Sequence, residues 1–135
     1  MNTKQITVLL VDDDVDFLEV NRTALEAAGY RVLTASDGEQ GMKLACENPV
    51  SVAVLDVMMS TPDEGFHLAR ELRSDERTRR IPLLMLTSVN AENRARGLAT
   101  FSDADRDDAY LPVDRFVEKP VRPDRLVDLV AQVLA

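Results

Sequence analysis

The sequence predicts an α/β fold: a doubly wound sheet of five parallel strands in the order 2-1-3-4-5, with helices between the strands. Short apolar runs alternate with segments of helical spacing along the chain. Three of these runs, at 6–11, 52–55 and 81–86, are nearly continuous apolar, as in strands that helices cover on both faces. The length of 135 residues, 45% of them apolar, suits one domain with a proper core. Right-handed crossovers between parallel strands, and the commonest arrangement of five-stranded sheets of this kind, then predict the strand order.

Each expected element follows from its own local pattern. The five strands are expected at runs rich in Val, Ile and Leu: 6–11, 31–35, 52–55, 81–86 and 115–117. The first helix presents an apolar face and ends at Gly29, and Asp14 or Asp16 is its expected N-cap. That face is formed by Phe17, Val20, Ala24, Leu25 and Ala28.

The remaining helices are predicted by caps and spacing. Ser36 and Glu39 have the spacing of a capping box at the start of the second helix. Two further helices are expected at about 65–73 and 91–99. The last carries Pro123 in its first turn, and its apolar positions are Leu126, Val127, Leu129, Val130, Val133 and Leu134. The chain ends after this helix, so we expect one domain over 1–135 without an attached output domain. The sequence suits both a stand-alone protein and a piece of a longer one.

Composition excludes several classes of function. The net charge of −8 argues against direct nucleic-acid binding, which needs a surplus of Lys and Arg. The single Cys46 excludes an internal disulfide and a multi-cysteine metal site, and it is more typical of a small buried apolar residue than of a reactive thiol. No apolar run is long enough for membrane insertion, and the first residues lack the apolar core of a signal peptide. We therefore expect a soluble cytoplasmic protein.

Chemically active residues follow four of the expected strands. Asp12 and Asp13 follow the first, Asp56 the third, Thr87 the fourth and Lys119 the fifth. Each has an ordinary structural explanation alone, such as a helix cap, a loop hydroxyl or a surface lysine. These four strands are neighbours in the 2-1-3-4-5 order, so their carboxyl ends place the five side chains at one edge, where such folds bind ligands.

The residue types at this edge indicate phosphoryl chemistry. Clustered carboxylates repel one another unless a cation lies among them, and oxygen ligands around a small cavity suit Mg²⁺. A lysine beside the metal adds positive charge that attracts a phosphoryl group. One carboxylate then serves as nucleophile and forms an aspartyl phosphate, while Thr87 and Lys119 contact the transferring oxygens.

Four segments in order, VLLVDDD, VLDVMM, MLTS and FVEKP, resemble the two-component response-regulator receiver domain over essentially the whole chain. The resemblance implies a flavodoxin-like (βα)5 fold of the stand-alone, single-domain type. It implies that Asp56 is the phosphoacceptor and that Asp13 is the direct Mg²⁺ ligand. Asp12 would act through water, and the backbone carbonyl of Met58 would complete the metal ligands.

The same resemblance assigns the remaining site residues. Thr87 would be the switch hydroxyl, and Lys119 the phosphate-binding lysine before a cis Pro120. Phe116 occupies the switch-aromatic position, with a plain core aromatic as the alternative. The only histidine, His67, is expected on the surface, because the phosphohistidine donor belongs to the partner.

Two segments depart from the family pattern. Ser60 stands where a proline is usual, and the loop after Asp56 is longer by one residue. Lys119 follows Thr87 by 32 residues, about ten more than usual, which predicts an insertion at 100–113. This acidic segment lacks the Gly and terminal Glu of a calcium loop, so a solvated loop is favoured. It lies beside the face of the fourth helix, fifth strand and fifth helix, where we expect it to affect homodimerisation or partner choice.

The sequence is compatible with three candidate functions, which experiments can distinguish. The first is a receiver that takes a phosphoryl group from a sensor histidine kinase or phosphotransfer protein, acts on a downstream protein target and is not a turnover enzyme. The second is a phosphatase of the haloacid-dehalogenase type, whose Asp-x-Asp spacing occurs within Asp12–Asp13–Asp14. The third is a docking module that works without phosphorylation. The sequence names neither the kinase nor the target, and it fixes neither the phosphoryl lifetime nor the oligomeric state.

Overall fold

The computed structural model describes residues 5–57, 64–87 and 114–134. Its strands form one parallel sheet in the order β2-β1-β3-β4-β5, which confirms the predicted order. The strands are β1 (Thr7–Val11), β2 (Arg31–Ala35), β3 (Val52–Asp56), β4 (Leu83–Thr87) and β5 (Arg115–Glu118). Within the described ranges the helices are α1 (Val15–Ala27), α2 (Gly38–Glu47), α3 (Glu64–Ser74) and α5 (Pro123–Leu134). The helix expected at 91–99 and the insertion at 100–113 lie outside these ranges.

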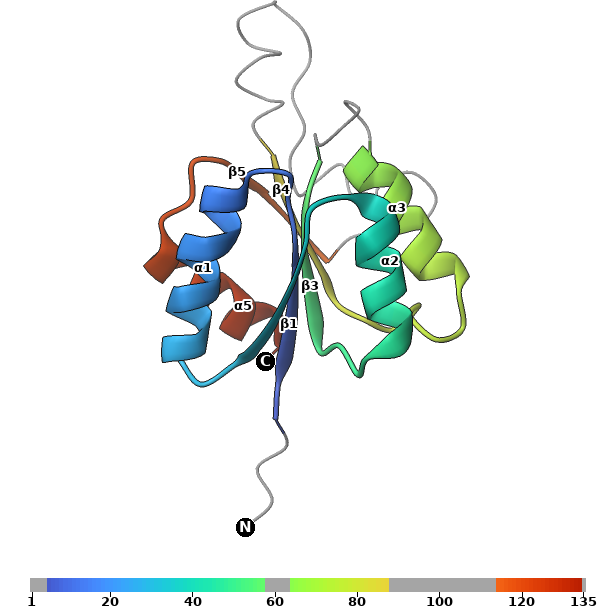
Figure 1. Ribbon diagram of the computed structural model, residues 1–135, viewed down its shortest axis with the longest axis horizontal. Helices are drawn as coiled ribbons and strands as arrows, with labels where there is room; N and C mark the ends of the chain where they lie inside the picture. Colours follow the sequence, from blue (N-terminus) through green and yellow to red (C-terminus); the bar gives the residue numbers. More distant parts are fainter. Residues whose placement is uncertain (1–4, 58–63, 88–113, 135) are drawn as a thin grey trace, which may run out of the picture.

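The sheet lies between two helical layers (Figure 1). Helices α1 and α5 cover one face, and α2 and α3 cover the other. Successive residues of β1 alternate between the two cores: Leu9 packs on the α2–α3 side, whereas Val8 and Leu10 pack on the α1–α5 side. Every residue of β1 and β3 is buried. The nearly continuous apolar runs are therefore explained by burial on both faces.

Helix α1 differs from its predicted apolar face. Its buried residues are Leu18, Asn21 and Leu25, whereas Val20 is 54% exposed. These buried residues are spaced by three and four positions, as expected for one face of a helix. Because Asn21 is polar, the pattern of apolar residues alone does not identify this face. The prediction was therefore wrong for Val20 and for Ala28, which is the exposed C-cap of the helix.

The start of α2 also differs from the prediction by one residue. The N-cap is Asp37, whose carboxylate accepts from the backbone N–H of Gln40 at 2.7 Å. The Gln40 side chain accepts in return from the N–H of Ser36 at 2.9 Å. The arrangement is close to a capping box, but Asp37 takes the place of Ser36 as the cap, and Gln40 reaches back to the N–H of Ser36, one residue before the cap. Pro123 begins α5 as predicted.

No helix within the described ranges is long and apolar enough to cross a membrane.

Candidate functional site

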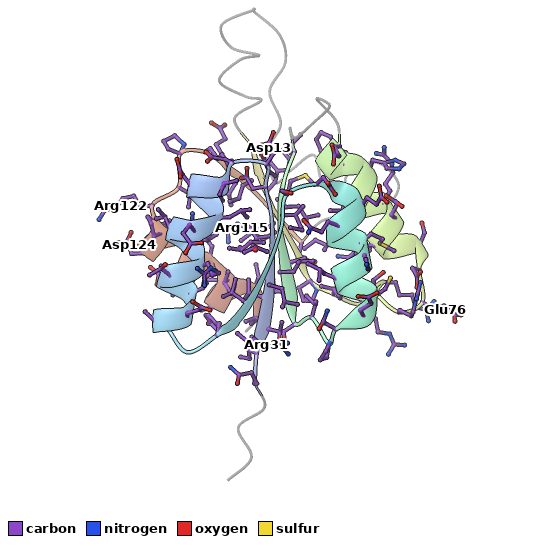
Figure 2. All side chains as sticks on the ribbon, viewed as in Figure 1. Asp13, Arg31, Glu76, Arg115, Arg122 and Asp124 are labelled. Carbon is purple, nitrogen blue, oxygen red and sulfur yellow. The ribbon has the colours of Figure 1, made fainter. Side chains whose placement is uncertain are left out.

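The strand register brings the predicted residues to one edge of the sheet. Val11 of β1 pairs with Leu55 of β3, so Asp12 and Asp56 follow on adjacent strands at the same level. Asp56 in turn pairs with Leu86, and Thr87 ends β4 beside β5. Figure 2 shows Asp13 at this carboxyl edge, opposite Arg31 at the other end of the sheet. The convergence expected from the strand order is therefore present.

The three consecutive aspartates have different local roles. Asp12 is 1% exposed, its backbone N–H donates to the carbonyl of Ala35, and its Oδ1 accepts from the N–H of Asp14 at 2.9 Å. Asp14 is the N-cap of α1 and accepts from the N–H of Phe17 at 3.2 Å. This resolves the choice between Asp14 and Asp16 in favour of Asp14, because a residue with extended backbone just before the first turn is placed to accept from that turn. Asp13 is exposed and points its carboxylate toward the same group of acids.

Lys119 crosses from the end of β5 to the aspartates. Its Nζ lies 2.7 Å from Oδ2 of Asp12 and 3.6 Å from Oδ1 of Asp56. The Lys119 side chain is 19% exposed and that of Asp56 only 7%, so the charges interact with limited screening by solvent. The same Nζ lies over the ring of Phe17, 4.3 Å from its centroid. The peptide bond between Lys119 and Pro120 is cis, as the sequence resemblance implied.

The carboxylates form a donor set that suits a hard divalent cation. One oxygen from each of Asp12, Asp13 and Asp56 lies within 4.8 Å of the others. Two of these residues are buried and one is exposed, so the group opens to solvent on the Asp13 side. Carboxylate oxygens with room for water are what Mg²⁺ prefers. The donor chemistry therefore fits the predicted Mg²⁺.

Of the other predicted site residues, the structure describes Phe116 in full and Thr87 in its backbone only. The backbone of Thr87 ends β4, but its side chain lies outside the description. Met58 and Ser60 also lie outside it. Phe116, at 6% exposure, belongs to the core on the α2–α3 side and stacks on Phe66 of α3, with ring centroids 6.4 Å apart and an interplanar angle of 11°.

Two residues with no predicted role lie away from the carboxylates. His67 is exposed on α3, as expected, and its Nε2 lies 3.4 Å from Oε1 of Glu71. Cys46 is a free and partly buried cysteine on α2. The exposure of His67 confirms its expected surface placement, and neither residue belongs to the group of carboxylates that could hold a metal.

Sequence reasoning missed two residues that shape the site. The helical spacing predicts for Phe17 only a place on the apolar face of α1, yet its ring contacts Lys119. The helical spacing predicts only that a helix begins at about residue 65, yet Gly65 lies against the backbone that carries Asp56. A glycine inside the first turn of a helix is the one sequence feature that indicates such a close approach, because glycine disfavours helices otherwise.

Comparisons with known proteins agree with this geometry. Residues 8–131 match the family of response regulator receiver domains. The transcriptional regulatory protein GltR of Pseudomonas aeruginosa is 35% identical over 136 aligned positions, covering 99% of this chain and 51% of GltR. The phosphate regulon transcriptional regulatory protein PhoB of the same species is 33% identical, covering 95% of this chain and 51% of PhoB. The chain thus spans about half the length of these relatives.

Solved structures show the same fold. The chemotaxis response regulator CheY4 of Vibrio cholerae superposes with a TM-score of 0.80 at 26% identity, covering 97% of this chain and all of CheY4. The non-phosphorylated receiver domain of HemR from Leptospira biflexa gives a TM-score of 0.74 at 26% identity, covering 97% of this chain and 95% of that one. The flavodoxin-like fold predicted from the sequence is therefore confirmed.

Proposed function

The chain belongs to the response regulator receiver family, and on that basis we propose that Asp56 accepts a phosphoryl group from a phosphohistidine. The observation that supports this most directly is the position of Lys119, whose ammonium reaches both Asp12 and Asp56 at the carboxyl edge of the sheet. The ammonium is placed to neutralise oxygens of a group transferred to Asp56.

The proposed reaction is a phosphoryl transfer between two side chains. A carboxylate oxygen of Asp56 forms a bond to phosphorus, the bond from phosphorus to the partner's imidazole nitrogen breaks, and that nitrogen takes a proton from solvent. Asp12, Asp13 and Asp56, with the backbone carbonyl of Met58, would hold Mg²⁺, which supplies positive charge to the transferring oxygens. Lys119 holds one of these oxygens and Thr87 another.

The proposed output is a change of conformation that controls a partner protein. Thr87 and Phe116 are the proposed switch residues, because Thr87 ends β4, which pairs with the strand of Asp56, and Phe116 lies on β5, which pairs with β4. The chain would catalyse only its own phosphorylation and the slow hydrolysis of the product, in the cytoplasm. Its proposed partners are a histidine kinase or phosphotransfer protein and a downstream protein. A homodimer would use the face of β5 and α5, together with the helix expected at 91–99.

The competing functions predict different products. A phosphatase of the haloacid-dehalogenase type would carry its phosphoryl group on Asp12, whereas a docking module would carry none. Asp12 is 1% exposed and engages both Lys119 and the N–H of Asp14. These contacts favour a structural and metal-binding role for Asp12 and leave the nucleophile at Asp56.

The test is to incubate the chain with Mg²⁺ and acetyl phosphate, trap the acyl phosphate with borohydride, and map the modified peptide by mass spectrometry. We expect modification at Asp56, none in Asp56→Asn, and normal modification in the control Asp16→Asn, which changes an exposed aspartate of α1. Modification at Asp12 would support the phosphatase. Absence of modification and of beryllium fluoride binding would overturn the receiver function.

A further inference from the structure

The ammonium of Lys119 has three partners in the described site, and one of them is not a carboxylate. Asp12 lies at 2.7 Å and Asp56 at 3.6 Å. The third is the face of Phe17, whose ring centroid lies 4.3 Å from Nζ. An ammonium at this distance over an aromatic face is attracted by the electrons of the ring.

Phe17 is fixed in this place through two of the consecutive aspartates, the site residue Asp12 and the N-cap residue Asp14. Oδ1 of Asp12 accepts from the N–H of Asp14, and the side chain of Asp14 accepts from the N–H of Phe17. The ring of Phe17 contacts Lys119, and Lys119 returns to Oδ2 of Asp12. These contacts form a closed circuit of four residues, so the position of the ring relative to Lys119 depends on the start of α1.

The three partners differ in what happens to them during the proposed reaction. Asp12 belongs to the carboxylate group that suits Mg²⁺, and Asp56 would become an acyl phosphate. Both would therefore lose negative charge available to Lys119. The ring of Phe17 binds neither a metal nor a phosphoryl group, so its attraction for the ammonium is the same before and after transfer.

We propose that Phe17 is a positioning residue, which holds the Lys119 ammonium beside Asp56 when the carboxylates are occupied by other partners. The proposal deepens the receiver function and depends on it for its kinetic consequence. The positioning depends on the ring electrons and not on bulk alone, so an aliphatic side chain of similar size does not replace Phe17.

The contact itself is tested without metal or phosphate. The ring current of Phe17 should move the ¹H signals of the methylene next to Nζ of Lys119 upfield in the NMR spectrum of the metal-free protein. Lys119→Arg identifies these signals. We expect the upfield shift in the wild type and in Phe17→Tyr, and its loss in Phe17→Leu. An unshifted Lys119 methylene in the wild type would overturn the contact.

The consequence is tested by the rate of phosphoryl uptake from acetyl phosphate in saturating Mg²⁺. We expect Phe17→Leu to be slower by about three- to tenfold, the range that a partly desolvated cation–π contact gives. Phe17→Tyr should retain the wild-type rate within about twofold, because it keeps the ring face. Val20→Ala, an exposed change on the same helix, is the control and should have no effect. Thermal unfolding identifies any loss that comes from misfolding.

The outcomes separate the two proposals. Equal rates in the wild type and a folded Phe17→Leu would overturn the positioning role and leave the receiver function standing. Equal losses in Phe17→Leu and Phe17→Tyr would overturn it as well, because the aromatic face would then not matter. A wild type that takes up no phosphoryl group at Asp56 would overturn the receiver function, while the NMR shift would still test the contact.

Discussion

Gly65 lies directly against the backbone of Asp56. A Cβ added to Gly65 would lie 2.0 Å from the carbonyl oxygen of Asp56 and 2.6 Å from the Cα of Val57. The N–H of Gly65 donates to the carbonyl of Val57 at 2.8 Å. Because backbone atoms cannot move aside as a flexible side chain can, only glycine permits α3 to approach the strand end that carries Asp56.

We therefore expect Gly65→Ala to displace α3 from β3 and to lower the free energy of unfolding by about 3 kcal/mol, the upper part of the usual range for overpacking. Urea unfolding measures this loss, and phosphoryl uptake should fall with it. Gly38→Ala is the matched control, because its Cβ would lie 3.2 Å from Oε2 of Glu64, the end of a movable side chain. An unfolding free energy of Gly65→Ala equal to that of the wild type would contradict the packing argument.

The meeting of the site carboxylates and Lys119 at one edge of the sheet could be predicted from the sequence, because it depends only on the order and direction of the strands. Asp12, Asp56 and Lys119 each follow an apolar run, and parallel strands bring their carboxyl ends to one edge. Phe17 and Gly65 could not be predicted, because their roles depend on how closely a helix approaches a strand end. In the sequence Phe17 is an ordinary residue of an amphipathic helix, and Gly65 indicates a close approach without indicating which backbone lies there.

The exact N-cap residue and the buried face of a helix also could not be predicted from the sequence pattern alone. The choice between Ser36 and Asp37 as N-cap depends on a shift of one residue, and both residue types cap helices well. The burial of Asn21 in place of Val20 depends on the rotation of α1 about its axis. Element type follows from periodicity, whereas register within an element follows from tertiary contacts.

Removal of the Lys119 charge should destabilise the metal-free protein. Lys119→Met leaves the buried carboxylate of Asp12 without the ammonium at 2.7 Å, so we expect the free energy of unfolding to fall by about 3 kcal/mol. Mg²⁺ should restore part of this loss and stabilise the variant more than the wild type. Thermal unfolding with and without Mg²⁺ is the measurement. Arg122→Met, which removes an exposed pair with Asp124, should change stability by less than about 0.5 kcal/mol. Similar effects of the two substitutions would contradict this account.

Stabilisation by Mg²⁺ should depend on Asp13. The wild type should gain about 2.7 kcal/mol when the Mg²⁺ concentration is a hundred times the dissociation constant, because the ion binds only the folded chain. Asp13→Asn should lose most of this gain, since it removes one charge from the carboxylate group. Asp16→Asn should keep it, because Asp16 lies outside that group. Thermal unfolding over a Mg²⁺ titration, reversed by a chelator, makes the comparison. A full gain in Asp13→Asn would contradict the assignment of the ligand.

Acid should remove a small stabilising contribution from Asp75. Hydrogen bonds from the side chain and backbone N–H of Arg77 lower the pKa of Asp75 from 3.8 to about 2. A carboxyl group whose pKa is lower in the folded than in the unfolded protein stabilises the folded state at a pH above its unfolded-state pKa. This stabilisation is lost as the pH falls through the folded-state pKa. The contribution is therefore complete above about pH 4 and disappears toward pH 2. Arg77 is exposed and Asp75 is only partly buried, so salt should weaken the effect. Unfolding of the wild type and Asp75→Asn across this range, at low and high salt, should converge at pH 2. Parallel profiles for the two proteins would contradict the prediction.

The stacked rings of Phe66 and Phe116 should be energetically coupled. Phe66 follows Gly65 on α3, and Phe116 lies on β5 at the far side of the site, so the pair joins the helix beside Asp56 to the strand that leads to Lys119. A double-mutant cycle with Phe66→Leu and Phe116→Leu should give a coupling energy of about 0.5–1.5 kcal/mol in urea unfolding. If Phe116 is the switch aromatic, beryllium fluoride with Mg²⁺ should change this coupling, because the ring would leave its partner. A coupling that is present and unchanged by the mimic would instead make Phe116 a plain core aromatic. Additivity of the two substitutions without the mimic would show that the rings contribute only as separate apolar groups.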